Sequence, residues 1–145
     1  SLVLSQTLTA ALRTLSQQEG VTLFTLLLAA FQTLLYRYTG CDDIPIGTPV
    51  ANRTRLETEG LIGFFVNTLV LRTDLTGNPS FRELLQRVRE VTLAANTYQD
   101  MPLELLVDAL RPARDPGHTP LFQVMFMLQN TLQETVALPG LTAWD

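Results

Sequence analysis

One segment near the N-terminus, residues 22–38, limits the possible folds more than any other part of the chain. Apolar residues recur on nearly every side of a helix drawn through it, so such a helix must be covered on most sides by other elements. Thr22 is suited to cap its start, and Gly40 follows its end. The apolar residues are Leu23, Phe24, Leu26, Leu27, Ala30, Phe31, Leu34, Leu35 and Tyr38. We therefore expect a layered domain with a substantial core.

Composition agrees with one globular domain and excludes several functions. The 145 residues are 46% hydrophobic and 17% charged, enough to build a core. Arginine supplies all ten basic residues, and fourteen acids leave a net charge of −4, so we expect no nucleic-acid partner. No apolar run approaches the roughly 18 residues of a membrane span, and the first residues lack the charged region of a signal peptide. These features predict a cytoplasmic protein.

Cysteine and histidine are each represented by a single residue. Cys41 has no partner for an internal disulfide and is followed by two aspartates, which disfavour a reactive thiolate. His118 stands in a turn-rich loop, where we expect an exposed side chain and no catalytic role. One histidine cannot make a multi-histidine metal site, and we predict no metal.

The remaining pattern predicts the order α-α-β-β-α-α-β. A first helix carries Leu8, Leu12 and Leu15 and ends near Gly20. Ile44 to Val50 contains two prolines, which favours an edge strand or an extended segment over a central strand. Residues 52–60 read as an exposed loop and residues 61–72 as a strand.

The second half of the chain predicts two helices and a strand. Ser80 and Glu83 form a capping box that starts a helix reaching about Thr97. Pro102 fits the first turn of another helix. Residues 121–128 are apolar enough for a buried strand. In the tail after Asn130 the apolar residues follow neither a helical nor a strand periodicity. The fold class is thus α/β, with helices packed on a mixed sheet.

Four segments in order carry a resemblance to a known family. Ile46 to Arg53 is similar to the Gly-x-Pro-x-Ala-x-Arg motif of condensation domains in non-ribosomal peptide synthetases, and Ile62 to Arg72 resembles the next motif of that family. Tyr98 to Glu104 is similar to its His-Gln-Asp-x-Pro-Phe-Glu motif, with Tyr98 in place of histidine and leucine in place of phenylalanine. Arg114-Asp115 with residues 120–126 resembles its arginine-aspartate and Pro-Leu-Phe-Gln-Val segment.

The resemblance implies a partial fold and a divided function. Such domains have two chloramphenicol-acetyltransferase-like lobes facing each other across a tunnel, and all the motifs found here belong to the second lobe. The family's His-His-x-x-x-Asp-Gly signature, which supplies the catalytic histidine, is absent from this sequence. We therefore interpret residues 1–145 as a partial C-terminal lobe, excised, truncated or part of a longer polypeptide, with no catalytic residue and no condensation activity of its own.

The resemblance also assigns candidate site residues, reactants and partners. Tunnel-lining or structural positions are Gly47, Pro49, Asn52, Arg53, Gly63, Phe64, Phe65, Asn67 and Thr68. The segment that differs from its family motif at two positions contributes further candidates, which are Tyr98, Gln99, Asp100, Pro102 and Glu104. No cofactor is expected to be covalently bound, and the phosphopantetheine arms of donor and acceptor peptidyl carrier proteins present the substrates. The implied partners are those carriers and the N-terminal lobe, with self-association of the isolated chain through uncovered surfaces.

Several alternatives stay open at this point. Asn67 either ties its strand to a neighbouring loop or lines the tunnel, because a polar residue in an apolar strand needs partners. Arg53 either pairs with Glu57 and Glu59, faces a phosphate of a carrier protein, or braces the structure near the tunnel. Asp100 and Glu104 at a helix start suit the helix dipole without any chemistry.

Two function classes also remain. The chain is either part of an amide-forming enzyme or a non-catalytic docking module for carrier proteins. A His-His-x-x-x-Asp-Gly signature upstream in the same reading frame would favour the enzyme. A heterocyclisation relative is a further alternative, and an epimerisation relative is disfavoured by the Gly47-to-Arg53 motif.

Overall fold

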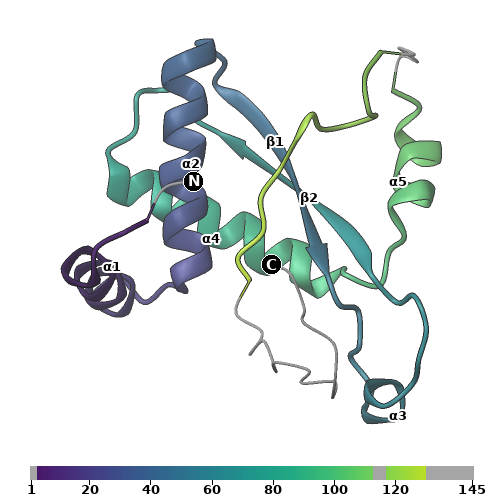
Figure 1. The fold of residues 1–145 in the computed structure, drawn as a ribbon. Coiled ribbons are helices and arrows are strands. Elements are labelled where there is room, and N and C mark those ends of the chain that lie inside the picture. Colours follow the sequence, from purple (N-terminus) through teal and green to yellow (C-terminus); the bar gives the residue numbers. More distant parts are fainter. Residues whose placement is uncertain (1–2, 113–116, 130–145) are drawn as a thin grey trace, which may run out of the picture.

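The computed structural model describes residues 3–112 and 117–129 and shows helices packed on a small mixed sheet (Figure 1). The elements, in chain order, are α1 (Gln6–Gln18), α2 (Leu23–Thr39), β1 (Asp43–Val50), α3 (Leu56–Glu59), β2 (Asn67–Asp74), α4 (Phe81–Thr97), α5 (Leu103–Leu110) and β3 (Val124–Met125). This order confirms the predicted succession of helices and strands, with the short α3 added inside the predicted loop. The Arg114-Asp115 pair and the tail from Asn130 lie outside the described residues.

The helix boundaries follow the capping residues read from the sequence. Thr22 accepts a hydrogen bond from the backbone N–H of Thr25 at the start of α2, and Gly40 ends the helix in the left-handed conformation, with φ of 70°. At the start of α4, Ser80 and Glu83 form both bonds of the capping box. Pro102 lies one position earlier than predicted, as the residue that precedes α5.

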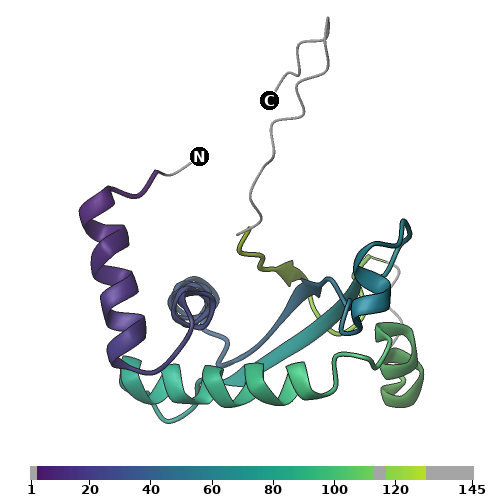
Figure 2. The ribbon, with the colours of Figure 1, turned by 90° about the horizontal axis from the view of Figure 1, so that it is seen from below.

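The core lies between one face of the β1–β2 ladder and the helices α2 and α4 (Figure 2). Leu28, Ile46, Leu71, Leu85 and Val88 are fully buried there. The prediction that α2 is covered on most sides is only partly correct, because Leu34 and Tyr38 are exposed on it. α1 packs against α2 alone among the described elements.

The position of β1 corrects one prediction. β1 is the central strand of a sheet ordered β2-β1-β3, antiparallel to β2 and parallel to β3. The backbone N–H of Phe126 donates to the carbonyl of Gly47 at 2.9 Å, so the polar groups of Gly47 point toward β3. Pro45 and Pro49 share that orientation because N–H groups alternate along a strand. The prolines therefore leave the ladder with β2 intact and lack N–H groups only on the β3 side.

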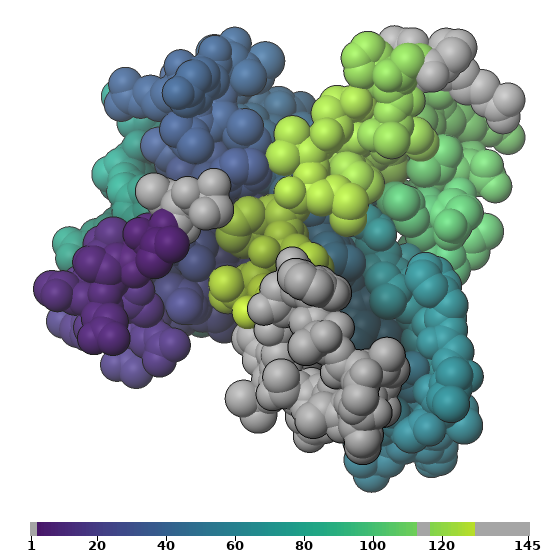
Figure 3. All heavy atoms as spheres, viewed as in Figure 1, coloured from purple at the N-terminus to yellow at the C-terminus, as the bar shows by residue number. Residues whose placement is uncertain are grey.

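The same geometry explains why the last strand is shorter than predicted. Residues 121–128 were expected to form a buried strand, but β3 comprises only Val124 and Met125, opposite Ile46 and Gly47. The two prolines of β1 flank this pairing and offer no further N–H donors. Figure 3 shows residues 117–129 lying over the sheet between α2 and α5.

The strand predicted at residues 61–72 begins later, at Asn67. Pairing with β1 runs from Asp43–Asp74 to Val50–Asn67 and stops there. Asn52, with φ of 51°, turns the chain away from the sheet. Residues 51–66, which we call the excursion, then project from one end of the sheet with α3 at their tip (Figure 1). Ile62 and Phe64 are consequently exposed rather than buried.

Candidate functional site

A pocket of about 310 Å³ collects residues from three of the segments that carry the resemblance. It lies where the base of the excursion, the start of β2 and the turn before α5 meet. Its lining residues are Asn52, Phe64, Val66, Asn67, Thr68, Asp100, Pro102, Leu103 and Glu104. We call it the motif pocket. Segments about fifty residues apart in sequence thus meet at one place, which sequence spacing alone does not predict.

Asn67 holds these segments together. Its Nδ2 donates to the backbone carbonyls of Gln99 and Met101, each at 2.7 Å, and its Oδ1 accepts from the backbone N–H groups of Thr68 and Leu103 at 2.9 and 3.3 Å. All the bonding groups of the amide are therefore used. These are the contacts of an anchoring residue, and its carboxamide faces the turn before α5. A direct role for Asn67 toward a substrate stays a prediction.

Arg53 organises the base of the excursion. Its guanidinium donates to the backbone carbonyls of Thr58, Glu59 and Gly63 and lies 4.4 Å from the centre of the Phe65 ring. Pairing with the carboxylates of Glu57 and Glu59 was one interpretation, and among the described residues no such ion pair forms. Arg53 thus holds separate parts of the excursion together through backbone hydrogen bonds and the Phe65 ring.

The charged residues in the described lining of the motif pocket are both acidic. Asp100 and Glu104 contribute carboxylates, and no basic residue is among its described lining. The Oδ1 atom of Asn52 is buried and has no hydrogen-bond partner among the described residues. A buried acceptor without a partner costs on the order of 1–3 kcal/mol. The described lining thus combines two acidic residues with an asparagine whose Oδ1 atom lacks a donor.

The other candidate residues lie apart from this pocket. Gly47 lies under the ring of Phe122, and Pro49 lines a separate pocket on the α2 side of the sheet. Gly63 and Phe65 contact Arg53 in the excursion. Tyr98 is exposed, and Gln99 contributes its carbonyl to Asn67. Val66 and Leu103 line the motif pocket and were not singled out, although both fall inside the quoted segments.

His118 is exposed, as expected, and Cys41 is exposed as well. Within the described part of the chain, no group of three or more histidine, cysteine or acidic side chains is placed to hold a metal ion. No single described helix has the length and apolar character to cross a membrane. The pair α1 and α2, bent by 105°, passes the same test of length and composition together.

The comparisons with known proteins place the chain in a family. The family model described as Condensation domain matches residues 1–140, and the chain therefore belongs to the condensation domain family. Relatives include a linear gramicidin synthase of Brevibacillus parabrevis, 60% identical over 97% of this chain, and malpinin synthetase of Mortierella alpina, 54% identical over 92%. The chain spans only 3% and 2% of the length of these two relatives.

Solved structures agree on the fold. A four-domain non-ribosomal peptide synthetase, holo-AB3403 bound to AMP and glycine, superposes with a TM-score of 0.85 at 28% identity, over 89% of this chain and 10% of that one. The condensation domain of the Monacolin K polyketide synthase MokA superposes with a TM-score of 0.78 at 28% identity, over 86% of this chain and 29% of that one. The predicted fold, helices on a mixed sheet as a partial chloramphenicol-acetyltransferase-like sandwich, is confirmed.

Proposed function

We propose that this chain is the C-terminal lobe of a condensation domain and that its motif pocket lines the tunnel in which an amide bond forms. The reaction joins a donor acyl or peptidyl thioester to the amine of an acceptor aminoacyl thioester, both carried on peptidyl carrier proteins. The observation that carries the proposal is the convergence of three motif segments on one pocket. The family membership and the non-ribosomal peptide synthetase relatives support it. A cytoplasmic location stays a prediction.

The chemistry asks mainly for positioning. The amine nitrogen attacks the thioester carbonyl carbon, a C–N bond forms, the C–S bond breaks, and the thiol leaves with the proton that the amine gives up. Holding the nitrogen about 3–3.5 Å from that carbon can supply much of the acceleration. This chain has one histidine, His118, in an exposed loop, and no His-His pair. In the proposal this chain therefore positions the reactants, and the group that accepts the proton belongs to the other lobe.

The acceptor-rich lining of the motif pocket fits this role. A phosphopantetheine arm carries amide N–H groups, and the acceptor carries an amine, so both present donors. Asn52, Asp100 and Glu104 offer oxygen atoms that can receive them. The amide of Asn67 is already occupied and fixes the wall rather than binding the arm.

The excursion offers a surface for the N-terminal lobe. Ile62 and Phe64 are exposed on it although they are large and apolar, and such side chains gain free energy when a partner covers them. We assign this surface to the lobe interface and expect the chain alone to self-associate through it. Light scattering that shows a strict monomer at high concentration would contradict this assignment.

A complementation assay tests the proposed function. The purified chain, incubated with loaded donor and acceptor carriers, is expected to give no peptide product, and addition of a separately produced N-terminal lobe is expected to restore product formation. Asn67→Ala should abolish most of the restored activity, whereas Gln86→Ala, at an exposed position of α4, should leave it unchanged. Product from the chain alone, or equal activity of the two variants, would refute the proposal.

A further inference from the structure

Two side-chain atoms in the described part of the chain are buried and lack a hydrogen-bond partner. They are Oε1 of Gln32 and Oδ1 of Asn52. Gln32 is fully buried in the core, where its Nε2 donates to the hydroxyl of Thr73 at 3.0 Å. Asn52 as a residue is only partly buried, and it lines the motif pocket. Of the two, Asn52 is therefore the one that lies where a bound molecule could supply the missing donor.

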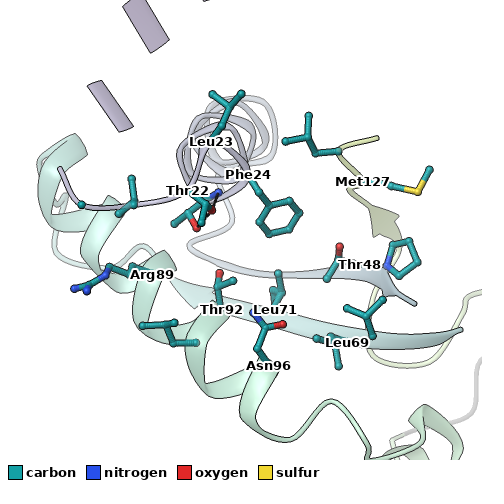
Figure 4. A pocket seen from close by; sticks show the side chains of 17 residues that line it. Thr22, Leu23, Phe24, Thr48, Leu69, Leu71, Arg89, Thr92, Asn96 and Met127 are labelled. Atoms are coloured by element: carbon teal, nitrogen blue, oxygen red, sulfur yellow. Dashed lines mark hydrogen bonds between the residues drawn. The ribbon is translucent and has the colours of Figure 1, made fainter. Parts of the chain in front are cut away.

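A larger pocket of about 620 Å³ lies between α2, α4 and the sheet (Figure 4). Most of its lining is aliphatic or aromatic and includes Phe24, Leu69 and Leu71. Neither Gln32 nor Asn52 is part of that lining. Its described residues thus contain no buried polar atom that needs a partner, so the motif pocket is the stronger candidate for a specific contact.

The backbone of Asn52 is held on both sides. Val50, two residues earlier, pairs with Asn67 at the end of the β1–β2 ladder. Arg53, the next residue, donates to backbone carbonyl groups of the excursion. Asn52 itself has φ of 51°, in the left-handed region that asparagine tolerates better than most residues and that glycine adopts freely. The residue is thus fixed at the point where the chain leaves the sheet, beside the wall that Asn67 anchors.

The carboxamide of Asn52 can turn, although its backbone is fixed. No hydrogen bond with a described residue holds it, and the last side-chain torsion of asparagine has a broad range. An oxygen that is cut off from water gains more free energy from a new donor than an oxygen that water already serves. Asp100 and Glu104, the acidic residues of the same pocket, are exposed to water. A donor in the motif pocket therefore gains most by binding Asn52.

We propose that the carboxamide oxygen of Asn52 accepts a hydrogen bond from an amide N–H of a phosphopantetheine arm. This inference rests on the proposed function, in which the motif pocket lines the tunnel. The arm suits the contact because every tethered substrate carries its amides, whereas an acyl donor or an acceptor amino acid need not contain one. Asn52 is then a binding residue that places the arm, and it takes no part in forming the new bond.

Steady-state kinetics of a complete condensation domain that contains this chain, with donor and acceptor offered as pantetheine thioesters, tests the proposal. Asn52→Gly removes the carboxamide and keeps a residue suited to the left-handed backbone, so the unfolding temperature should not fall. The KM should rise about two- to tenfold with kcat little changed. Asn78→Gly is the matched control, because Asn78 has φ of 49°, is exposed and lies outside the described lining of the motif pocket. It should change neither KM nor kcat.

An analogue of the arm identifies the group that Asn52 contacts. In this analogue, ester oxygens replace the amide nitrogens, so the arm keeps its length and loses its N–H donors. We expect it to raise the KM of the unaltered domain and to leave the KM of Asn52→Gly nearly unchanged, because the variant has no contact left to lose. Offering the analogue first as the acceptor arm and then as the donor arm shows which of the two arms Asn52 binds.

Several outcomes would overturn the inference and leave the proposed function standing. They are a KM for Asn52→Gly equal to that of the unaltered domain, an equal rise in KM for Asn78→Gly, and an equal effect of the ester analogue on the unaltered domain and on Asn52→Gly. A lower unfolding temperature of Asn52→Gly would also overturn it, because Asn52 would then have a structural role. An unaltered domain that forms no product would overturn the proposed function, and the inference with it.

Discussion

The core and the excursion use the same kinds of residue in opposite ways. In the core, Leu71 of β2 and Leu85 of α4 are buried in one apolar cluster with residues of α2 and β1. In the excursion, Ile62 and Phe64 are equally apolar but exposed, and Arg53 holds the loop through backbone carbonyls instead of packing. The difference shows that the core covers its apolar side chains with its own contacts, while the excursion leaves its apolar side chains uncovered by the described residues.

The largest effect is expected in the core. Leu85→Ala should lower the free energy of unfolding by about 2–5 kcal/mol, because the residue is fully buried and its neighbours cannot fill the space. Ile62→Ala in the excursion should change it by less than about 0.5 kcal/mol. Urea denaturation followed by circular dichroism measures both. Similar losses for the two variants would remove the contrast between the regions.

A close approach between β1 and the C-terminal segment should give the next effect. A Cβ at Gly47 would lie 2.5 Å from Cε2 of Phe122, so the ring would have to move from the sheet. Gly47→Ala should therefore cost about 1–3 kcal/mol, and Phe122→Leu in the same chain should recover part of that loss. Thermal unfolding of the single and double variants measures the coupling. Independent, additive effects would show that the contact is unimportant.

Asn67 lies where the two regions join. Asn67→Ala removes four hydrogen bonds at the wall of the motif pocket and should cost about 1–3 kcal/mol. The amide protons of Leu103 and Thr68 should then exchange faster with solvent, while those of α2 keep their protection. Gln86→Ala, at an exposed position of α4, is the control. Uniform loss of protection across the chain would mean that Asn67 supports the core rather than the pocket.

Acid should produce the smallest effect. A hydrogen bond from Arg72, with some contribution from its charge, holds the pKa of Asp43 below its ordinary value. The pair therefore stabilises the fold above the unfolded-state pKa of the carboxyl and loses this contribution as pH falls through its lower folded-state value. Both side chains are largely exposed, so the contribution is small and screened by salt. Asp43→Asn should make stability less dependent on pH between neutrality and about pH 3. If stability depended on pH as strongly in Asp43→Asn as in the unaltered chain, the Asp43–Arg72 pair would not be the source of this dependence.

The sequence predicted the helices better than the strands. Ser80, Thr22 and Gly40 act within their own helix ends, so their roles can be read from a few neighbouring residues. Strand positions depend on partners far away, and this is why β1 was misplaced at an edge and residues 61–66 were assigned to a strand. The prolines of β1 do restrict pairing, but on one side only.

The sequence predicted the residues of the candidate site as separate motifs, but it did not predict that they meet in one pocket. Asn52, Asn67 and Asp100 were each singled out, and only the fold shows that they line one pocket. The bonds of Asn67 to the carbonyls of Gln99 and Met101 involve backbone groups, which every residue carries, so no sequence pattern could have revealed them.

Disulfide trapping tests most directly whether the motif pocket lines the path of the tethered substrate. Thr68→Cys would be placed in a complete condensation domain that contains this chain with Cys41→Ser. This domain would be incubated, with oxidised glutathione as the oxidant, with a carrier protein whose phosphopantetheine thiol is free. The account predicts a disulfide between the new cysteine and the arm, and little or none with Thr97→Cys on exposed α4. Equal trapping at both positions, or trapping at the α4 position alone, would contradict it.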